Sequence, residues 1–397
     1  MLPQLGSIFK KFSRPTQSAV TSKDVLFLDL TPRSVKALYA QKGEKNFMLK
    51  GLGLAEVKPN QPDDIFSSAI DEAFAQAGDS TNNTVVGIGG PSVFGFLMIA
   101  KITRPDSQKR INAKELESLY AKLRSASYAQ AKNIRNILFA DEKDVQLLDL
   151  VVTAYQVDGN QVADPVDSIG TELQITVYSS YSEIYFYSSL MNTLDEKNLV
   201  PLAITTSIYS QTKILAAESK NFLLFDMGKS YTDIAVIFGK NIVLTRSFEI
   251  GGDFFTEYIM EKTGMAFKEA NGKKEAYSEG TLTPEETDTI GDLLYEAGKI
   301  WRTGLMSVLE SLTGIKTFPK KIYITGGSSN LNVIEELLYE DDWHKALPFS
   351  GGVEVMHPAD TSLTEFLVDD LKLLKGKRMF APSSLSVIFS ELENPDE

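Results

Sequence analysis

Residues 222–236 decide the fold, and they read Phe222-Leu-Leu-Phe-Asp226-Met-Gly228-Lys-Ser-Tyr-Thr232-Asp-Ile-Ala-Val236. The apolar run before Asp226 is typical of a buried strand, and it ends in a carboxylate. Residues 228–232 follow as a turn, because glycine permits close approach of the backbone. The N–H groups of this turn and the hydroxyls of Ser230 and Thr232 can then face anionic oxygens. The stretch therefore predicts a strand and turn that hold a phosphate.

An equivalent stretch lies near the start of the chain, where Val25-Leu-Phe-Leu-Asp29 is a second apolar run that ends in an acid. A third run, residues 322–325, precedes Gly326 and Gly327, which would let a flat adenine lie against the main chain. Acids at two strand ends that face one cleft can hold hydrated Mg²⁺, which prefers carboxylate and water oxygens and accompanies phosphates. We therefore predict Asp29 and Asp226 as metal ligands and catalytic acids, one from each of two related lobes.

Each of these signals also has an ordinary structural explanation. An acid at a strand end often forms an Asx turn or caps a helix, and a pair of glycines often marks a tight turn. Their order along the chain, their spacing and their strand context together favour a functional cleft.

Composition excludes several classes of protein. The chain has 397 residues, which predicts two or three structural units. Apolar residues make up 43% and charged residues 23%, as in ordinary globular proteins, so a disordered chain is excluded. A net charge of -13 has the wrong sign for a protein that binds nucleic acid. Without cysteine, and with only His344 and His357, the chain offers no thiolate or histidine-rich metal site.

Strand and helix patterns alternate along most of the chain, and a separate mixed pattern interrupts them early. We therefore predict an α/β fold with an inserted α+β subdomain. The predicted segments are an N-terminal segment and linker (1–23), the first lobe core (24–84 and 173–219), the insert (85–172), the second lobe core (220–252 and 320–397) and a helical subdomain (253–319).

The first residues combine an amphipathic pattern with positive charge. Apolar residues follow the spacing of one helical face and basic residues interleave with them: Leu5, Ile8, Phe9, Phe12, Lys10, Lys11 and Arg14. Such a helix can lie in a membrane interface with its lysines against anionic lipid. A helix that docks on a partner or on the protein itself, or a frayed tail, fits the pattern as well. A secretory signal is rejected, because it would need charge first and then a continuous apolar core.

The motif residues resemble a known family. The stretch 222–236, with the later Gly251 and Gly252, resembles the second phosphate motif of the actin-like ATPases FtsA, of cell division, and PilM, of type IV pilus assembly. Residues 155–173 are similar to the end of the inserted subdomain of FtsA, and residues 322–327 resemble the adenosine motif. The resemblance covers roughly residues 24 to 360.

The resemblance implies a two-lobed actin-like ATPase fold, made of duplicated ribonuclease-H-like domains, that binds ATP and Mg²⁺. It also implies a cytoplasmic protein on the inner face of the membrane that self-associates and binds a peptide of FtsZ or of a pilus inner-membrane component. The residues at motif positions that would contact the nucleotide are Ser34, Lys36, Gly228, Lys229, Ser230, Thr232, Gly251, Gly252, Lys274, Gly326, Gly327 and Ser328.

The sequence departs from the family pattern in ways that bear on catalysis. Thr31 and Pro32 stand where the first phosphate motif has small residues, and Pro32 lacks an N–H donor. Residues 205–207 offer hydroxyls where PilM-like sequences place acids, and a hydroxyl is a poor general base near neutral pH. The helix that offers Glu and Lys to the nucleoside in relatives keeps only the lysine, Lys274. We therefore expect slow or absent hydrolysis, with ATP acting mainly as a ligand that stabilises the closed state.

Several functions remain open at this point. A membrane-associated scaffold of the FtsA type is the leading hypothesis, and a PilM-like pilus component is the second. Residues 391–397 are acidic where FtsA proteins usually carry a basic amphipathic helix, so lipid contact would fall to residues 1–14. A small-molecule kinase of the sugar-kinase type shares the fold but would need a general base between the lobes. A scaffold that has lost nucleotide binding is the fourth reading, suggested by Thr31 and Pro32.

Overall fold

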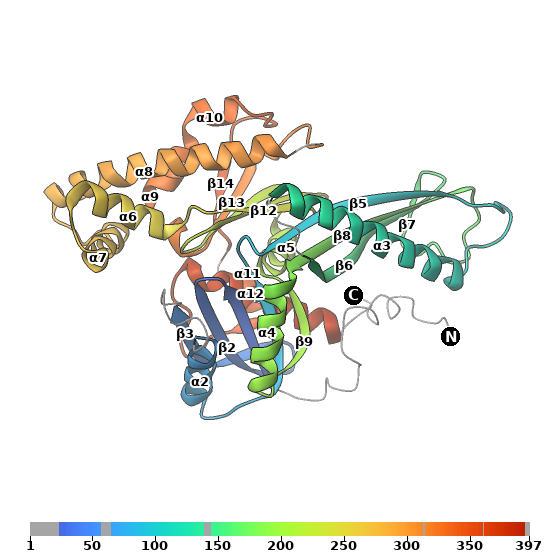
Figure 1. Cartoon of the computed structure of the whole chain (residues 1–397), viewed down its shortest axis with the longest axis horizontal. Helices are drawn as coiled ribbons and strands as arrows, with labels where there is room; N and C mark the ends of the chain where they lie inside the picture. The colour runs from blue at the N-terminus through green and yellow to red at the C-terminus, as the bar shows by residue number, and fades with distance from the viewer. Residues whose placement is uncertain (1–23, 57–64, 139–143, 313, 360, 394–397) are drawn as a thin grey trace.

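The computed structural model describes residues 24–56, 65–138, 144–312, 314–359 and 361–393. Two halves lie one above the other in Figure 1, and an elongated insert projects from their junction. The predicted N-terminal segment, including its lipid-binding face, lies outside the described residues.

The sheet of the first half contains six strands in the order β15-β3-β2-β1-β4-β9. Strand β1 pairs antiparallel with β2 and parallel with β4; β2 pairs antiparallel with β3, and β4 pairs parallel with β9. The bounds of these strands are β1 Asp24–Thr31, β2 Ser34–Lys42, β3 Phe47–Glu56, β4 Asn83–Ile88, β9 Val200–Thr206 and β15 Leu367–Val368.

The sheet of the second half repeats this arrangement. Strand β10 pairs antiparallel with β11 and parallel with β13; β11 pairs antiparallel with β12, and β13 pairs parallel with β14. The bounds are β10 Phe222–Met227, β11 Thr232–Phe238, β12 Asn241–Phe248, β13 Lys321–Thr325 and β14 Glu354–Met356. The order β12-β11-β10-β13-β14 matches β3-β2-β1-β4-β9 strand for strand, which confirms the predicted duplicated α/β fold.

The insert adds four strands to the second sheet rather than forming a separate sheet. Strand β5 pairs antiparallel with β12 at Phe96 and Gly95, and the sheet continues as β5-β8-β6-β7. Helix α3 (Ala113–Leu138) packs its apolar residues on these strands. The strand bounds are β5 Val93–Thr103, β6 Val145–Val157, β7 Asn160–Val162 and β8 Glu172–Glu183.

Helices cover the sheets of both halves. Those of the first half and the junction are α2 Ile65–Ala77, α4 Ile184–Glu196, α5 Ser207–Glu218, α11 Thr361–Thr364 and α12 Phe380–Glu393. Those of the second half are α6 Gly252–Thr263, α7 Phe267–Ser278, α8 Pro284–Ser311, α9 Asn332–Tyr339 and α10 Asp341–Lys345. Two short 3₁₀ helices, η2 Gly327–Asn330 and η3 Lys377–Met379, contact each other. The first also contacts β13 of the second half, and the second contacts α12.

Three segments lie elsewhere than the sequence-based division placed them. Strand β8 pairs with β5 and β6, so residues 173–183 belong to the insert and not to the first lobe core. Strand β4 pairs with β1, so the insert begins after Ile88 and not at residue 85. Strand β15 and helix α12 pack on the first half, although the sequence assigned residues 320–397 to the second. Sheet pairing and the apolar face of α12 decide these memberships, and neither is visible in local patterns.

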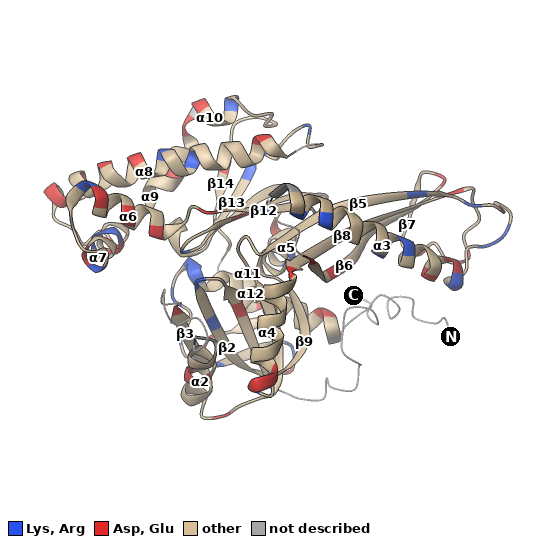
Figure 2. Ribbon diagram, in the orientation of Figure 1, with Lys and Arg blue, Asp and Glu red and all other residues tan. Residues whose placement is uncertain are grey.

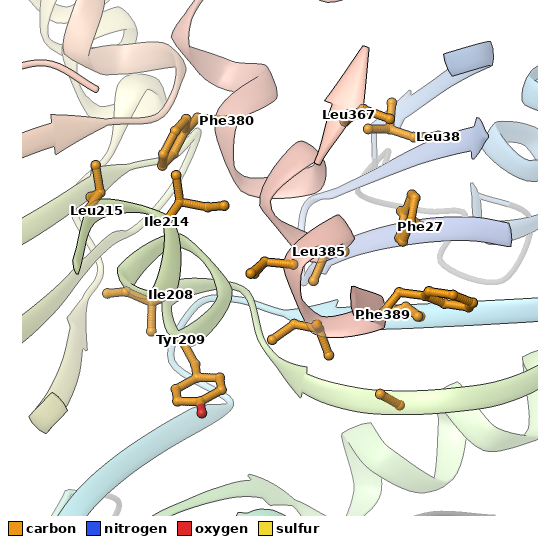
Figure 3. Close-up of a cluster of buried hydrophobic side chains, with 14 of the residues drawn as sticks. Phe27, Leu38, Ile208, Tyr209, Ile214, Leu215, Leu367, Phe380, Leu385 and Phe389 are labelled. Atoms are coloured by element: carbon orange, nitrogen blue, oxygen red, sulfur yellow. The ribbon is translucent and has the colours of Figure 1, made fainter. Parts of the chain in front are cut away.

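A hydrophobic core joins the two halves at their junction. Buried side chains of α5 and α12, among them Ile208, Tyr209 and Leu385, pack with Phe27 of the first sheet and Phe222 of the second. Figure 3 shows the labelled side chains of the two helices gathered around this junction. The junction is therefore a packed element and not a loose linker.

Charged residues are scattered over both halves and the insert, whereas the central strands are largely uncharged (Figure 2).

Among the residues that the structure describes, none of the helices is both long and apolar enough to cross a membrane.

Candidate functional site

A cleft of ≈ 870 Å³ lies between the two halves and collects turns and strand ends from both. Most of the residues predicted from the motifs line it together. These are Asp29, Ser34, Lys36, Asp226, Gly228, Lys229, Ser230, Gly252, Lys274, Gly326, Gly327 and Ser328. The two predicted residues outside the lining are Thr232 and Gly251.

Thr232 and Gly251 pack against the turn of residues 228–231, which connects β10 to β11 and is called the second turn below. Thr232 is fully buried, and its hydroxyl donates to the carbonyl of Ile250 at 2.7 Å and accepts from Trp301 Nε1 at 3.0 Å. At Gly251 a Cβ atom would lie 2.6 Å from the nitrogen of Tyr231, so only glycine fits there. Neither residue belongs to the lining of the cleft, and both hold the turn in shape.

The carboxylate of Asp29 accepts hydrogen bonds from two side chains, one on β2 of the first half and one on α5. Lys36 Nζ lies 2.5 Å from Oδ2, and the Ser207 hydroxyl donates to Oδ1 at 2.6 Å. The lysine reaches the acid because Asp29 and Lys36 are paired residues of the antiparallel strands β1 and β2. Since the Asp29 carboxylate is only 2% exposed, these partners supply the hydrogen bonds that water would otherwise donate to it.

Asp226 is the matching acid of the second half. Its Oδ2 accepts from Gln211 Nε2 at 2.6 Å. Burial raises the pKa of Asp226, and the positive charge of Lys36 and the Gln211 hydrogen bond oppose that increase. The acids of both halves therefore line one cleft and share the field of a single lysine.

Asp233 is another acid of the cleft lining, although the motifs assigned it no role. It is paired with Asp226 across the hairpin of β10 and β11. Its Oδ2 accepts from the backbone N–H of Gly90 at 2.9 Å, and its Oδ1 accepts from Ser247. Burial and then the charge of Asp226 raise the pKa of Asp233 to about 7. The hairpin register of residues 226–233 is the sequence signal that could have revealed it.

The second turn is a compact loop closed by its own backbone. Gly228 N–H donates to the carbonyl of Tyr231 at 2.9 Å, and the Gly228 carbonyl accepts from Gly252 N–H at 3.1 Å and from the Ser328 hydroxyl at 2.8 Å. The first N–H groups of α6 are thus used by this turn. An anion in the cleft would meet the exposed side of the turn and not the end of that helix.

The first turn, residues 31–34 between β1 and β2, uses its backbone N–H donors in hydrogen bonds within the turn. The Thr31 hydroxyl accepts from the backbone N–H of Ser34 at 3.0 Å and from that of Arg33 at 3.4 Å. Its oxygen also lies 3.0 Å from Ser34 Oγ. With Pro32 lacking an N–H, this turn offers fewer backbone donors to a phosphate than the second turn does. Lys36, on β2 beside this turn, is the cation of the first hairpin that lines the cleft.

The far end of the cleft is formed by the turn after β13 and by helix α7. Gly326 has φ 83°, and a Cβ atom there would lie 2.4 Å from Asp226 Oδ1. Lys274 Nζ donates to the carbonyl of Gly252 at 2.8 Å and to Thr256 Oγ1 at 2.7 Å, and burial lowers its pKa. Lys274 therefore lines the cleft and is hydrogen-bonded to the first turn of α6.

Comparison with known proteins agrees with this geometry. No family model matches the chain. The chain is 25% identical over 350 residues to the cell division protein FtsA of Enterococcus hirae, a match that covers 79% of this chain and 75% of that protein. It is similar in structure to a chain of the PilM-PilN type IV pilus biogenesis complex, with a TM-score of 0.60, 17% identity, and coverage of 92% of this chain and 98% of that one.

The chain has the fold of the actin-like ATPases, and it is similar in sequence to FtsA and in structure to a chain of the PilM-PilN complex. The predicted resemblance to FtsA and PilM and the predicted two-lobed fold are both confirmed. In this actin-like chain the cleft between the lobes is the site to which the matched motif residues converge.

The donor set of the cleft fits a magnesium nucleotide in type, although it is not a complete protein cage. Within the described ranges no group of three or more His, Cys, Asp or Glu side chains is arranged to hold a metal ion. Mg²⁺ usually keeps several waters and binds through one or two carboxylates together with substrate phosphates. Asp29 and Asp226 are the carboxylates that would serve, and Lys36 and the second turn would contact phosphate oxygens.

Proposed function

We propose that this chain binds ATP with Mg²⁺ between its lobes. It acts as a cytoplasmic scaffold of the FtsA type that self-assembles. The scaffold tethers a division ring or similar assembly to the inner membrane. The observation that carries the proposal is the convergence of Asp29 and Asp226, from equivalent strands of the two halves, on one cleft. The match to a protein named for cell division supports the choice of system.

Slow or absent hydrolysis is part of the proposal. The hydroxyls at the end of β9 and the start of α5 already donate to carboxylates: Thr205 to Asp149 at 2.8 Å and Ser207 to Asp29 at 2.6 Å. A hydroxyl is a far weaker base than a carboxylate, so neither residue would take the proton of an attacking water near neutral pH. For the same reason, Thr205 and Ser207 are unsuited to be the general base of a small-molecule kinase. ATP then acts as a ligand that stabilises the closed lobes.

Calorimetric titration with ATP, with and without Mg²⁺, tests nucleotide binding directly. We expect binding that Mg²⁺ strengthens, together with a phosphate release rate far below that of a dedicated ATPase. No heat of binding at millimolar nucleotide would leave only a scaffold without a ligand. Rapid turnover would remove the claim of slow hydrolysis but not the claim of binding.

Membrane association is assigned to residues 1–14, which combine apolar and basic residues. We expect vesicles of anionic lipid to retain the full chain and to lose a version that begins at residue 15. Vesicles of neutral lipid are the control, because binding to them would show that charge does not matter. Equal sedimentation of both versions with anionic vesicles would refute the assignment.

A PilM-like role is the second candidate, and the structural likeness over 98% of the PilM chain favours it. The two roles call for different partner peptides. Titration with a peptide from the FtsZ C-terminus and with one from the N-terminus of a pilus inner-membrane component distinguishes them. Binding of only the second would move the protein from division to pilus assembly.

A further inference from the structure

Helix α5 presents one donor to each of two acids that line the cleft, Asp29 and Asp226. Ser207, its first residue, donates to Asp29 Oδ1 of the first half, and Gln211 donates to Asp226 Oδ2 of the second half. Both hydrogen bonds are 2.6 Å long. Both donors are buried, with exposures of 2% and 0%.

The spacing of the two donors follows from helix geometry. Residues four apart lie on the same face of an α-helix, about 6 Å apart along its axis. One rigid helix thus touches two carboxylates that belong to different sheets and come from β1 and β10. The same face of α5 therefore contacts both carboxylates, and two carboxylates brought to one cleft can share a hydrated Mg²⁺ through its waters.

The orientation of the Gln211 amide is determined by a second partner. Thr325, the last residue of β13, donates its hydroxyl to Gln211 Oε1 at 2.8 Å. The amide oxygen is thereby directed to Thr325 and its N–H group to the carboxylate of Asp226. Because Gln211 and Thr325 are both fully buried, water does not compete for these bonds.

The helix itself is firmly placed between the halves. The Thr206 hydroxyl caps its start by accepting from Tyr209 N–H, and Ser210 Oγ lies 2.7 Å from Ser384 Oγ of α12. On its other side Ile208, Ile214 and Leu215 enter the core of the junction (Figure 3). A change in the position of α5 would therefore move both donors together.

We propose that Ser207 and Gln211 are positioning residues through which α5 sets the spacing and orientation of Asp29 and Asp226 for a magnesium nucleotide. The inference rests on the proposed binding of ATP and Mg²⁺ in the cleft. It gives the hydroxyl at Ser207, where relatives are expected to carry an acid, a task in ligand geometry in place of proton transfer.

The test compares the gain in ATP affinity on adding Mg²⁺ between the full-length wild type and three variants, Gln211→Met, Ser207→Ala and the double variant. Gln211→Met keeps the volume of the side chain but removes the donor. We expect each single variant to reduce the Mg²⁺-dependent gain by roughly 10-fold, as for outer-shell partners of metal ligands. Affinity for ATP without Mg²⁺ should change by less than about 2-fold, which also shows that the variants are folded.

The double variant reports whether the two residues act through one helix. If α5 is a single template, losing either contact already loses the spacing, so the double variant falls no further than the worse single variant. Ser210→Ala is the matched control, because Ser210 is a buried serine of the same helix that bonds Ser384 and neither acid. It should leave the Mg²⁺-dependent gain unchanged.

The outcomes separate this inference from the function on which it rests. A wild type with a clear Mg²⁺-dependent gain that all variants retain overturns the positioning role and leaves the proposed function intact. Equal losses with and without Mg²⁺ also overturn it, because they indicate a structural role alone. A wild type that gains nothing from Mg²⁺ overturns the metal part of the proposed function, and the positioning role falls with it.

Discussion

The hairpins β1/β2 and β10/β11 occupy equivalent places in the two halves but pair their acids differently. In the first half Asp29 lies opposite Lys36, and in the second Asp226 lies opposite Asp233. The first acid is thus neutralised by its own hairpin. The second has an acid beside it, and the pKa of Asp233 is raised to about 7 by burial and by that neighbour.

This difference predicts how much each half would contribute to binding the proposed magnesium nucleotide. A pair of half-buried acids attracts a cation, whereas an acid already bound to a lysine attracts one less. We therefore expect the second half to contribute more of the metal affinity. The first half would contribute mainly Lys36, whose ammonium can bind phosphate oxygens.

Removing the lysine of the first hairpin gives the largest expected effect on stability. In Lys36→Met the Asp29 carboxylate loses its ionic partner while it stays 2% exposed. Breaking a buried pair in this way costs about 3 kcal/mol of unfolding free energy. Urea unfolding measures the loss, and the double variant Asp29→Asn/Lys36→Met should recover most of it. An unchanged midpoint in Lys36→Met would show that the pair does not stabilise the first hairpin.

Removing the acids themselves tests the division of metal affinity. Asp226→Ala should weaken binding of ATP in the presence of Mg²⁺ by at least about 100-fold, more than the loss typical of outer-shell partners. Asp29→Ala should weaken it less, because Lys36 already offsets that charge. Asp195→Ala, a change on α4 outside the cleft lining, is the control. Equal losses for Asp29 and Asp226 would remove the asymmetry between the hairpins.

Asp233 should make the stability of the protein depend on pH. Its folded-state pKa is raised from 3.8 to about 7, so the folded state holds the proton more tightly than the unfolded state does. This contribution to stability is present below about pH 4 and is lost as the pH rises to about 7. Asp233→Asn should therefore become more stable relative to the wild type between pH 4 and pH 7, by roughly 3 kcal/mol, since one pKa unit corresponds to about 1.4 kcal/mol. The hydrogen bond that the amide no longer accepts shifts the stability of the variant by the same amount at every pH.

Thermal unfolding of both proteins at several pH values without added nucleotide measures this difference. Asp233→Asn and the wild type with parallel pH profiles would show that the acid pair of the second hairpin is not electrostatically strained.

The ion pair between Lys229 and Glu56 crosses the cleft and gives the smallest expected effect. The two side chains are 32% and 66% exposed. Lys229→Ala should lower the unfolding free energy by at most about 0.5 kcal/mol, as for other surface pairs. The difference should vanish at 1 M salt, where charges are screened within about 3 Å. A loss that persists at high salt would mean that Lys229 does more than pair with Glu56.

The strand ends could be predicted from the sequence because an apolar run followed by an acid or glycine is a local pattern. Asp29, Asp226 and Gly326 were placed correctly in one cleft on that basis. Thr232 was not, because alternation along β11 directs its hydroxyl to Ile250 and Trp301. Ser207 could be noted only as a weak base, since its partner Asp29 lies 178 positions away in the chain.

The sequence by itself determined the two apolar strands, their terminal acids and the glycines that the tight turns require, because burial pattern and backbone freedom are local properties. Only the tertiary structure decided which donor each acid receives, the raised pKa of Asp233 and the joining of the insert to β12. Those features depend on desolvation and on hydrogen bonds between residues far apart in the chain, and no local pattern encodes the distance between them.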